Sequence, residues 1–318
     1  MTGNQLIIGT RGSELALKQT SMVKALLAAA HPELDVQHKV IATAGDKRPD
    51  LRFEDFSKGD SPIVDKGIFI KELEIALDDK SIDAAVHSLK DVPSDLEKQF
   101  VIAAVLERAP IQDVLISREK FTVETLPPGS RVGTSSVRRA RQLKWLRPDI
   151  EVVELRGNVP TRIRKVVEPG NLDAIMLAAA GLVRLGLLNE ALDTVSIDQV
   201  KLHAQVLDST KFYPAAGQGA IAIETRSKDS AVIDLIRSLN HAETEARVVA
   251  EREFLRLLGA GCQTPVGAHS WVVNHKLHMA VRVFSEADLA ADPVEAEASM
   301  SLSSPLSLAK KLASMVGN

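Results

Sequence analysis

The stretch RVGTSSVRRARQLKWL, residues 131–146, joins a short apolar segment to a helical pattern through a turn of small polar residues. The apolar start is typical of a buried strand, and the apolar positions after Ser136 recur at helical spacing. Arg138 and Arg139 stand where the helix begins. Strand–turn–helix units of this kind build α/β folds, in which crossover helices join the strands of a sheet.

Two other segments share this design. IIGTRGS (7–13) carries Arg11 and leads into an amphipathic pattern over 13–29, with Ser13 placed as its N-cap. VELRGNVPTR (153–162) carries Arg156 and Arg162. Strands therefore alternate with helices through the first two thirds of the chain, and this order predicts parallel sheets.

The pattern changes after about residue 240. NHAETEARVVAEREFLRLLGAG (240–261) predicts one long helix that ends at glycine. AHSWVV (268–273) and KLHMAVRVF (276–284) are strand-like, and LSLAKKLASMV (306–316) predicts a last helix. A chain of 318 residues is too long for one ordinary core. We expect three domains: residues 1–108 with 216–238, residues 109–215, and a small α+β domain over 239–318.

Composition limits the function classes. Cys262, in GAGCQTPVGA (259–268), is the only cysteine, which excludes an internal disulfide and fits a reducing compartment. No signal-peptide pattern opens the chain, and the longest apolar run, 175–183, is too short to span a bilayer. We expect a cytoplasmic protein that does not bind a membrane. No His, Cys, Asp or Glu cluster has metal-binding spacing, so no metal is expected.

Positive charge is concentrated in one region. Residues 131–165 hold ten Arg or Lys against three acids, yet the net charge is −3 and aromatic residues make up only 3%. Single-strand binders interleave stacking aromatics with cations, so nucleic acid is not expected as a partner.

The arginines predict an anionic ligand. Helix N-termini already carry partial positive charge, so arginine there is unfavourable for the helix itself. In open parallel sheets, however, ligands bind beyond the carboxyl ends of the strands, and arginine pairs bidentately with carboxylate or phosphate. No Walker loop or dinucleotide motif is present. Several separate arginines favour a ligand with spaced carboxylates, held between two α/β lobes.

HSLKDVP (87–93) ends another strand, with Lys90 and Asp91 in the turn. Such a pair is also common in ordinary exposed loops. Beside a cationic site, a carboxylate stays ionised and can stabilise a developing cation or accept hydrogen bonds from ligand N–H groups. His87 is expected only to pack against the strand end.

Together these motifs resemble the porphobilinogen deaminase family, also called hydroxymethylbilane synthase. The matching stretches, in family order over residues 7 to about 268, are TRGSELAL, DKGIFIKELE, DAAVHSLKDVP, VGTSSVRRARQL, LRGNVPTR, LAAAGLVRLG, PAAGQGAIAIE, NHAET and GAGCQTPVG. The resemblance implies two α/β domains like those of type II periplasmic binding proteins, with a cleft between them. It also implies a return of the chain to the first domain near GQG (217–219), and a small α+β C-terminal domain.

The resemblance implies a transferase of tetrapyrrole and heme biosynthesis that acts as a monomer. Its substrate is porphobilinogen, and its cofactor is a dipyrromethane joined by a thioether to Cys262. Four substrate molecules add in turn with loss of ammonia, and hydrolysis releases the linear tetrapyrrole hydroxymethylbilane.

By motif position, the catalytic carboxylate is Asp91. The residues implied to hold the cofactor are Cys262, Lys90, Asp91, Ser136, Arg138 and Arg139. Those implied to bind substrate are Arg11, Ser13, Lys66, Phe69, Arg156, Arg162 and Arg184. Phe69 fits a helix core as well as a stacking position. Many family members have lysine where this chain has Pro62, and the preceding loop (48–64) is long, so Lys66 lacks its usual neighbour.

Two alternatives stay open on the residues alone. A non-catalytic two-lobed anion-binding protein explains the arginines but not HSLKDVP or the cysteine turn. A thiol-nucleophile transferase predicts a histidine near Cys262, such as His241 or His269, and leaves the arginines without a role.

Overall fold

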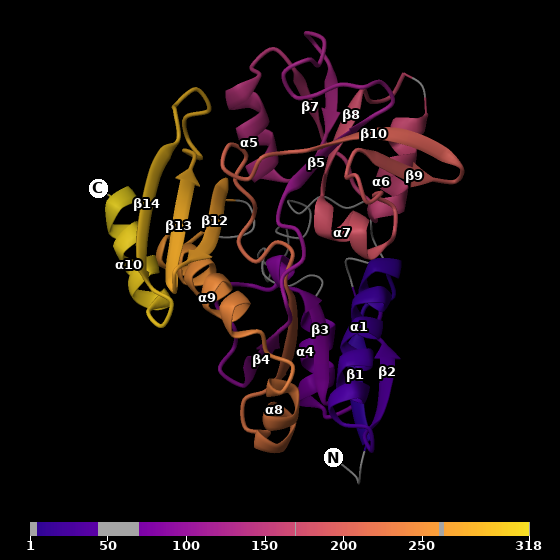
Figure 1. Cartoon of the computed structure of the whole chain (residues 1–318), viewed down its shortest axis with the longest axis vertical. Helices are drawn as coiled ribbons and strands as arrows, with labels where there is room; N and C mark the ends of the chain where they lie inside the picture. Colours follow the sequence, from indigo (N-terminus) through magenta and orange to yellow (C-terminus); the bar gives the residue numbers. More distant parts are fainter. Residues whose placement is uncertain (1–4, 44–69, 169, 261–263, 318) are drawn as a thin grey trace, which may run out of the picture.

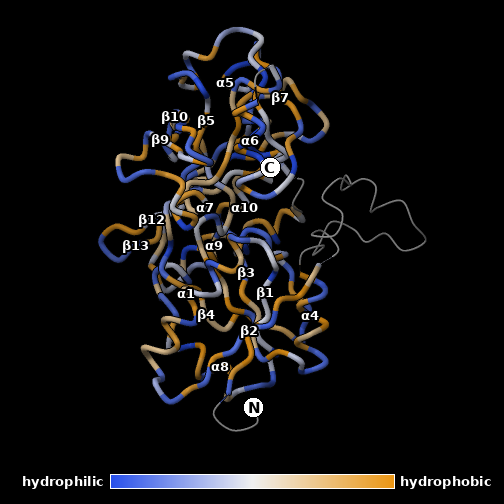
Figure 2. The backbone as a smooth tube through the Cα atoms, turned by 90° about the vertical axis from the view of Figure 1, so that its right-hand side faces the viewer, coloured by the Kyte–Doolittle hydropathy of each residue, from blue (hydrophilic) through white to orange (hydrophobic). Residues whose placement is uncertain are grey.

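The computed structural model describes residues 5–43, 70–168, 170–260 and 264–317. Within these ranges the chain forms three sheets (Figure 1). Figure 2, turned by a quarter, shows that β1 and β5 belong to opposite halves of an elongated molecule. None of the described helices is long and apolar enough to cross a bilayer.

The first sheet has five strands in the order β2-β1-β3-β11-β4. In that order they span Asp35–Val40, Gln5–Thr10, Ala84–Ser88, Ile221–Arg226 and Phe100–Val105. The helices of this part are α1 (Glu14–Ala30), α4 (Lys71–Asp78) and α8 (Ser230–Arg237), and the short helix η1 (Leu89–Asp91) follows β3 directly. Apolar side chains from β1, β3, α1 and α8 form one buried core cluster.

The second sheet has six strands in the order β7-β6-β8-β5-β10-β9. In that order they span Glu151–Val153, Arg131–Gly133, Ala174–Ala178, Asp113–Ser117, Val200–Val206 and Thr194–Ile197. Its helices are α5 (Val137–Leu146), α6 (Val159–Val167) and α7 (Ala179–Arg184). The helix predicted after the opening motif therefore begins and ends as expected.

The prediction of parallel sheets was wrong for three strands. β11 runs antiparallel to β3 and β4, β5 runs antiparallel to β8 and β10, and β9 runs antiparallel to β10. The path of the chain explains this. The chain leaves the first sheet at the carboxyl end of β4 and enters β5 from the junction of the two sheets. It returns from β10 to β11 in the same way, so the entering strands β5 and β11 run against their neighbours, and β9 forms a hairpin with β10.

The third sheet is antiparallel, with β12 (Val266–Val273), β13 (Lys276–Val283) and β14 (Val294–Ser301) in order. The helices α9 (Ala242–Leu257) and α10 (Pro305–Val316) share a core with it. The sequence analysis missed β14, because VEAEASMS has small and charged residues instead of an apolar run. The fold class, two α/β parts and a small α+β part, is confirmed.

Helix ends agree with local sequence. Ser13 Oγ accepts a hydrogen bond from Ala16 N at 3.3 Å, as its predicted N-cap role requires. At the end of α9, Gly259 has φ +63°, and the N–H groups of Gly259 and Ala260 donate to Arg256 O and Leu255 O. These two bonds form the glycine-terminated cap that stops a helix. The cap directly precedes the segment that carries Cys262.

Candidate active site

Most of the predicted site residues follow strands whose carboxyl ends face the junction of the first two sheets. They are Arg11 and Ser13 after β1, Lys90 and Asp91 after β3, Ser136, Arg138 and Arg139 after β6, Arg156 and Arg162 after β7, and Arg184 after β8. Carboxyl ends of parallel strands meet at one edge of a sheet. Two such edges oppose each other here, so residues far apart in the chain come together.

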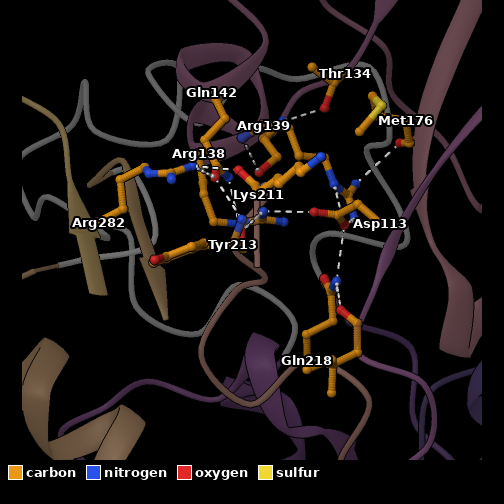
Figure 3. Close-up of polar contacts among 12 residues, drawn as sticks. Asp113, Thr134, Arg138, Arg139, Gln142, Met176, Lys211, Tyr213, Gln218 and Arg282 are labelled. Carbon is orange, nitrogen blue, oxygen red and sulfur yellow. Dashed lines mark hydrogen bonds and ion pairs between the residues drawn. The ribbon is translucent and has the colours of Figure 1, made fainter. Parts of the chain in front are cut away.

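The best-defined part of the site is a buried ion-pair cluster around Asp113 (Figure 3). Arg138 Nη1 donates to Asp113 Oδ2 at 2.7 Å and to Tyr213 O at 2.6 Å. Arg139 Nε and Nη2 donate to Asp113 Oδ1 at 2.9 and 2.7 Å, and Arg139 Nη1 donates to Met176 O at 3.2 Å. The two arginines of the opening motif therefore share one carboxylate.

Asp113 is fully buried and remains charged. Burial raises its pKa, but the charges and hydrogen bonds of Arg138 and Arg139 lower it more, so the pKa lies well below its ordinary value. Gln218 Nε2 donates to Asp113 Oδ1 at 3.0 Å and to Ile111 O at 2.7 Å. Arg138 Nε is buried without a hydrogen-bond partner among the described residues. One buried donor of the cluster, the Arg138 Nε–H, is therefore left for another acceptor.

Lys90 lies beside this cluster and is half-buried. Burial lowers the pKa of its ammonium from 10.5 to about 8, and Arg139 and Arg138 lower it further, while Asp91 and Asp113 oppose the shift. Asp91 itself is exposed, at the end of η1. A lysine that titrates near neutral pH next to an accessible carboxylate is typical of functional sites.

Arg162 and Arg184 complete the cationic surface. Burial lowers the pKa of Arg162 to about 10; Arg139 and Arg156 lower it too, and Asp91 raises it. Arg162 Nε donates to Gly157 O at 2.6 Å. Burial likewise lowers the pKa of Arg184 to about 10. Its Nη2 donates to Gly219 O at 2.6 Å, and its buried Nε has no partner within the described ranges.

The remaining predicted residues of this group have local contacts. Ser136 Oγ accepts from Arg139 N at 3.4 Å and is the N-cap of α5. Arg156 Nε donates to Glu154 at 2.6 Å. Arg11 is half-buried.

The start of α1, which follows Arg11 and Ser13, lies beside α7, the helix that follows β8 of the second sheet. A methyl group on Gly181 of α7 would lie 3.6 Å from Leu15 and 3.8 Å from Val159.

Three predicted residues, Cys262, Lys66 and Phe69, lie outside the described residues, as do Pro62 and the loop 48–64. The histidines considered as partners of the thiol have other contacts. His241 Nδ1 bonds the Thr244 hydroxyl at the start of α9, and His269 packs against Trp271 with ring centroids 4.9 Å apart. His87 is buried and bonds Glu224 at 2.8 Å, inside the first sheet.

Sequence reasoning missed a second buried cluster, which joins the third sheet to the crossing segments. Arg108 donates through Nη1 and Nη2 to Glu251 of α9 at 2.7 and 2.9 Å. Gly217 N also donates to Glu251 at 2.7 Å, and the Ser270 hydroxyl donates to it as well. A glutamate inside a long helical pattern gives no local sign of such a role.

Arg252, the next residue of α9, was also missed. Its Nη1 and Nη2 donate to Val92 O at 2.8 Å and to Pro93 O at 2.6 Å. These carbonyls directly follow Asp91 in the chain. The helix that precedes the cysteine therefore holds the backbone next to the predicted catalytic carboxylate.

A surface pocket of about 420 Å³ lies away from this charge cluster, beside the residues that follow the carboxyl end of β5. Its lining includes Arg118, Phe121 and Asp173 and no residue of the predicted site. The charge cluster, and not this pocket, is the candidate site.

The fold and the site together describe an α/β protein with several arginines and a lysine–carboxylate pair at the junction of two sheets. Family models match most of the chain: "Porphobilinogen deaminase, dipyromethane cofactor binding domain" covers residues 6–234, and "Porphobilinogen deaminase, C-terminal domain" covers 245–318. The chain therefore belongs to the porphobilinogen deaminase family, whose members are transferases, and the family expectation is confirmed.

Curated relatives agree with this assignment. The porphobilinogen deaminase of Syntrophobacter fumaroxidans is 44% identical over 285 residues, which are 90% of this chain and 86% of that protein. The porphobilinogen deaminase of Roseiflexus sp. is 46% identical over 263 residues, 83% of this chain and 80% of that protein.

Among solved structures, a probable amino-acid ABC transporter extracellular-binding protein of Bacillus subtilis is similar, with 11% identity and TM-score 0.43. The match covers 80% of this chain and 97% of that one. These values mark a distant likeness.

Proposed function

We propose that this chain condenses four porphobilinogen molecules, with loss of ammonia, on a dipyrromethane attached to Cys262, and releases hydroxymethylbilane by hydrolysis. The observation that carries the proposal is the charge cluster at the sheet junction. Lys90, Arg138, Arg139, Arg156 and Arg162 interact electrostatically there with one another or with Asp91. Pyrroles with acetate and propionate side chains match such a surface because each ring brings two carboxylates.

The donor set fits the carboxylates of the cofactor and of the substrate. Arg138 and Arg184 each keep a buried Nε–H without a partner among the described residues, and a desolvated donor of this kind favours a charged acceptor. In this proposal Lys90, Ser136, Arg138 and Arg139 bind cofactor carboxylates, and the Cys262 sulfur forms the thioether. When bound, the dipyrromethane supplies the pyrrole carbon on which the chain grows.

The substrate's carboxylates are assigned to Arg11, Ser13, Lys66, Arg156, Arg162 and Arg184, with Phe69 against a pyrrole ring. Asp91 accepts hydrogen bonds from pyrrole N–H groups and stabilises the positive charge that develops as ammonia leaves. In this proposal Asp91 also takes up the proton that the growing chain loses.

The protein is further proposed to be a cytoplasmic monomer. Its proposed domains are residues 1–108 with 216–238, residues 109–215 and residues 239–318. Each would contain one of the three sheets.

Intact mass tests the proposal. Active protein should exceed the mass of its sequence by one dipyrromethane and give an acid colour reaction for pyrroles. Cys262→Ser should lose both the added mass and nearly all turnover. Active wild-type protein with the bare mass would refute the covalent cofactor.

A further inference from the structure

We propose that Asp113 is a positioning residue for the two carboxylate-binding arginines, Arg138 and Arg139, and that Gln218 couples this unit to the turn packed against Lys90. The inference rests on the proposed roles of the two arginines. It assigns a function to a buried carboxylate that does not itself reach the ligand.

The two carboxylate oxygens of Asp113 accept hydrogen bonds from different partners. Oδ2 accepts from Arg138, whereas Oδ1 accepts from Arg139 and from Gln218 (Figure 3). A carboxylate held at both oxygens fixes the planes of both guanidinium groups, because charge-assisted bonds are short and directional. One negative charge against two positive charges leaves a net positive charge for a ligand.

The place of Asp113 in the chain adds to this argument. It is the first residue of β5, directly after the segment that crosses from the first sheet to the second. Gln218 lies in the segment that crosses back, and its side chain also bonds Ile111 O. The Asp113–Gln218 bond therefore joins the two crossing segments at the point where the arginines are held.

The turn at Gln218 also touches the loop of Lys90. Gly217 has φ +71°, and a methyl group added to it would lie 3.2 Å from Lys90 N and 3.1 Å from Leu89 Cγ. Only glycine fits both this backbone conformation and this approach. The contacts thus run without a break from Lys90 through Gly217 and Gln218 to Asp113.

Asp113 also affects the charge of Lys90. The charged groups that act on Lys90 are Arg139 and Arg138, which lower its pKa, and Asp91 and Asp113, which raise it. Lys90 is protonated below a pH of about 8. Without the charge of Asp113, its pKa falls further, and Lys90 loses its proton at lower pH.

Two substitutions separate positioning from simple neutralisation. Asp113→Asn keeps the shape but removes the charge, and Asp113→Glu keeps the charge but displaces it by one methylene. If Asp113 only neutralised the arginines, the asparagine variant would bind porphobilinogen more tightly and the glutamate variant would behave as wild type. Positioning predicts weaker binding in both, by about tenfold or more, since one partner of a buried charge pair is lost or moved.

The experiment measures kcat and KM for porphobilinogen on cofactor-loaded protein, with loading verified by intact mass, from about pH 6 to pH 10. KM should rise in both variants. The alkaline fall in kcat/KM should move to lower pH in Asp113→Asn and stay in place in Asp113→Glu. Glu253→Gln serves as the control and should change neither KM nor the alkaline fall in kcat/KM, because Glu253 pairs on α9 with the exposed Arg256.

The proposal would be overturned if Asp113→Asn left KM unchanged or lower and left the alkaline fall in kcat/KM at its wild-type pH. If Asp113→Asn does not fold, Asp113→Glu tests the proposal. Wild-type KM and kcat in Asp113→Glu would also overturn the proposal. Failure of the proposed function is distinguishable, since wild-type protein would then show no turnover of porphobilinogen.

Discussion

Replacement of Glu251 by glutamine should strongly destabilise the protein, because Glu251 connects three parts of the chain. Its carboxylate is fully buried and accepts from Arg108 on one crossing segment, Gly217 on the other and Ser270 in β12. Burial raises the pKa of Glu251, but Arg108 and the hydrogen bonds outweigh it, so its pKa lies below 4.5. The group is therefore charged at neutral pH.

The magnitude follows from the bonds that glutamine cannot form. Its NH₂ group would take the place of Oε1, where the Ser270 hydroxyl can reverse and accept but Arg108 Nη1 cannot. At Oε2 it would face both Gly217 N and Arg108 Nη2. One charge-assisted bond is lost in the better arrangement, and Arg108 is left buried without a counter-ion. Such a change costs about 3–5 kcal/mol in free energy of unfolding.

Urea unfolding at neutral pH, followed by circular dichroism and tryptophan fluorescence, measures this difference, with coincident curves as the test of two-state behaviour. Glu253→Gln is the matched control. Its pair with Arg256 has the same bond lengths, 2.7 and 2.9 Å, on the same helix, but Arg256 is exposed. The control should lose at most about 1 kcal/mol.

The effect of Glu251 should also depend on pH. A carboxylate whose folded pKa is depressed stabilises the protein above its unfolded pKa, and this contribution is lost as pH falls through the folded value. The difference between wild type and Glu251→Gln should therefore narrow in acid. Equal stability losses in Glu251→Gln and Glu253→Gln at neutral pH would refute the argument.

Three further predictions concern the catalytic loop. Asp91→Asn should keep the fold and slow turnover by about a hundredfold or more, as for loss of a preorganised charge; a near-normal kcat would contradict its role. In wild type, kcat/KM should fall as pH rises through about 8, where Lys90 loses its proton; Lys90→Arg should abolish this fall, and an identical pH profile would exclude Lys90 as its source. Arg252→Met should lower kcat with cofactor loading intact, because the Val92 and Pro93 carbonyls lose their donors; an unchanged kcat in folded, loaded protein would show that this contact does not position the loop.

Much of the fold could be predicted from local sequence. The periodic apolar positions of residues 137–146 and the caps Ser13 and Gly259 act within a few residues, so their geometry is decided locally. The strand β14 could not be predicted in the same way. Its residues are small or charged, and the strand exists because β13 pairs with it.

The candidate site likewise contains residues that local sequence predicts and residues whose role depends on distant contacts. Arginines at strand ends could be recognised because residue type and position in a strand–turn–helix unit are both visible in the sequence. Asp113, Glu251 and Arg252 could not, since their partners lie 19 to 160 residues away.

The sequence by itself determined the α/β class and the family, and it predicted an anionic ligand, because periodicity, charge and motif order depend on neighbours along the chain. Only the tertiary structure decided which strands run antiparallel and which carboxylates hold the arginines. Those outcomes depend on where the chain crosses between the sheets. Burial at these crossings makes an unpaired charge costly, so the buried arginines there pair with carboxylates that are distant in the sequence.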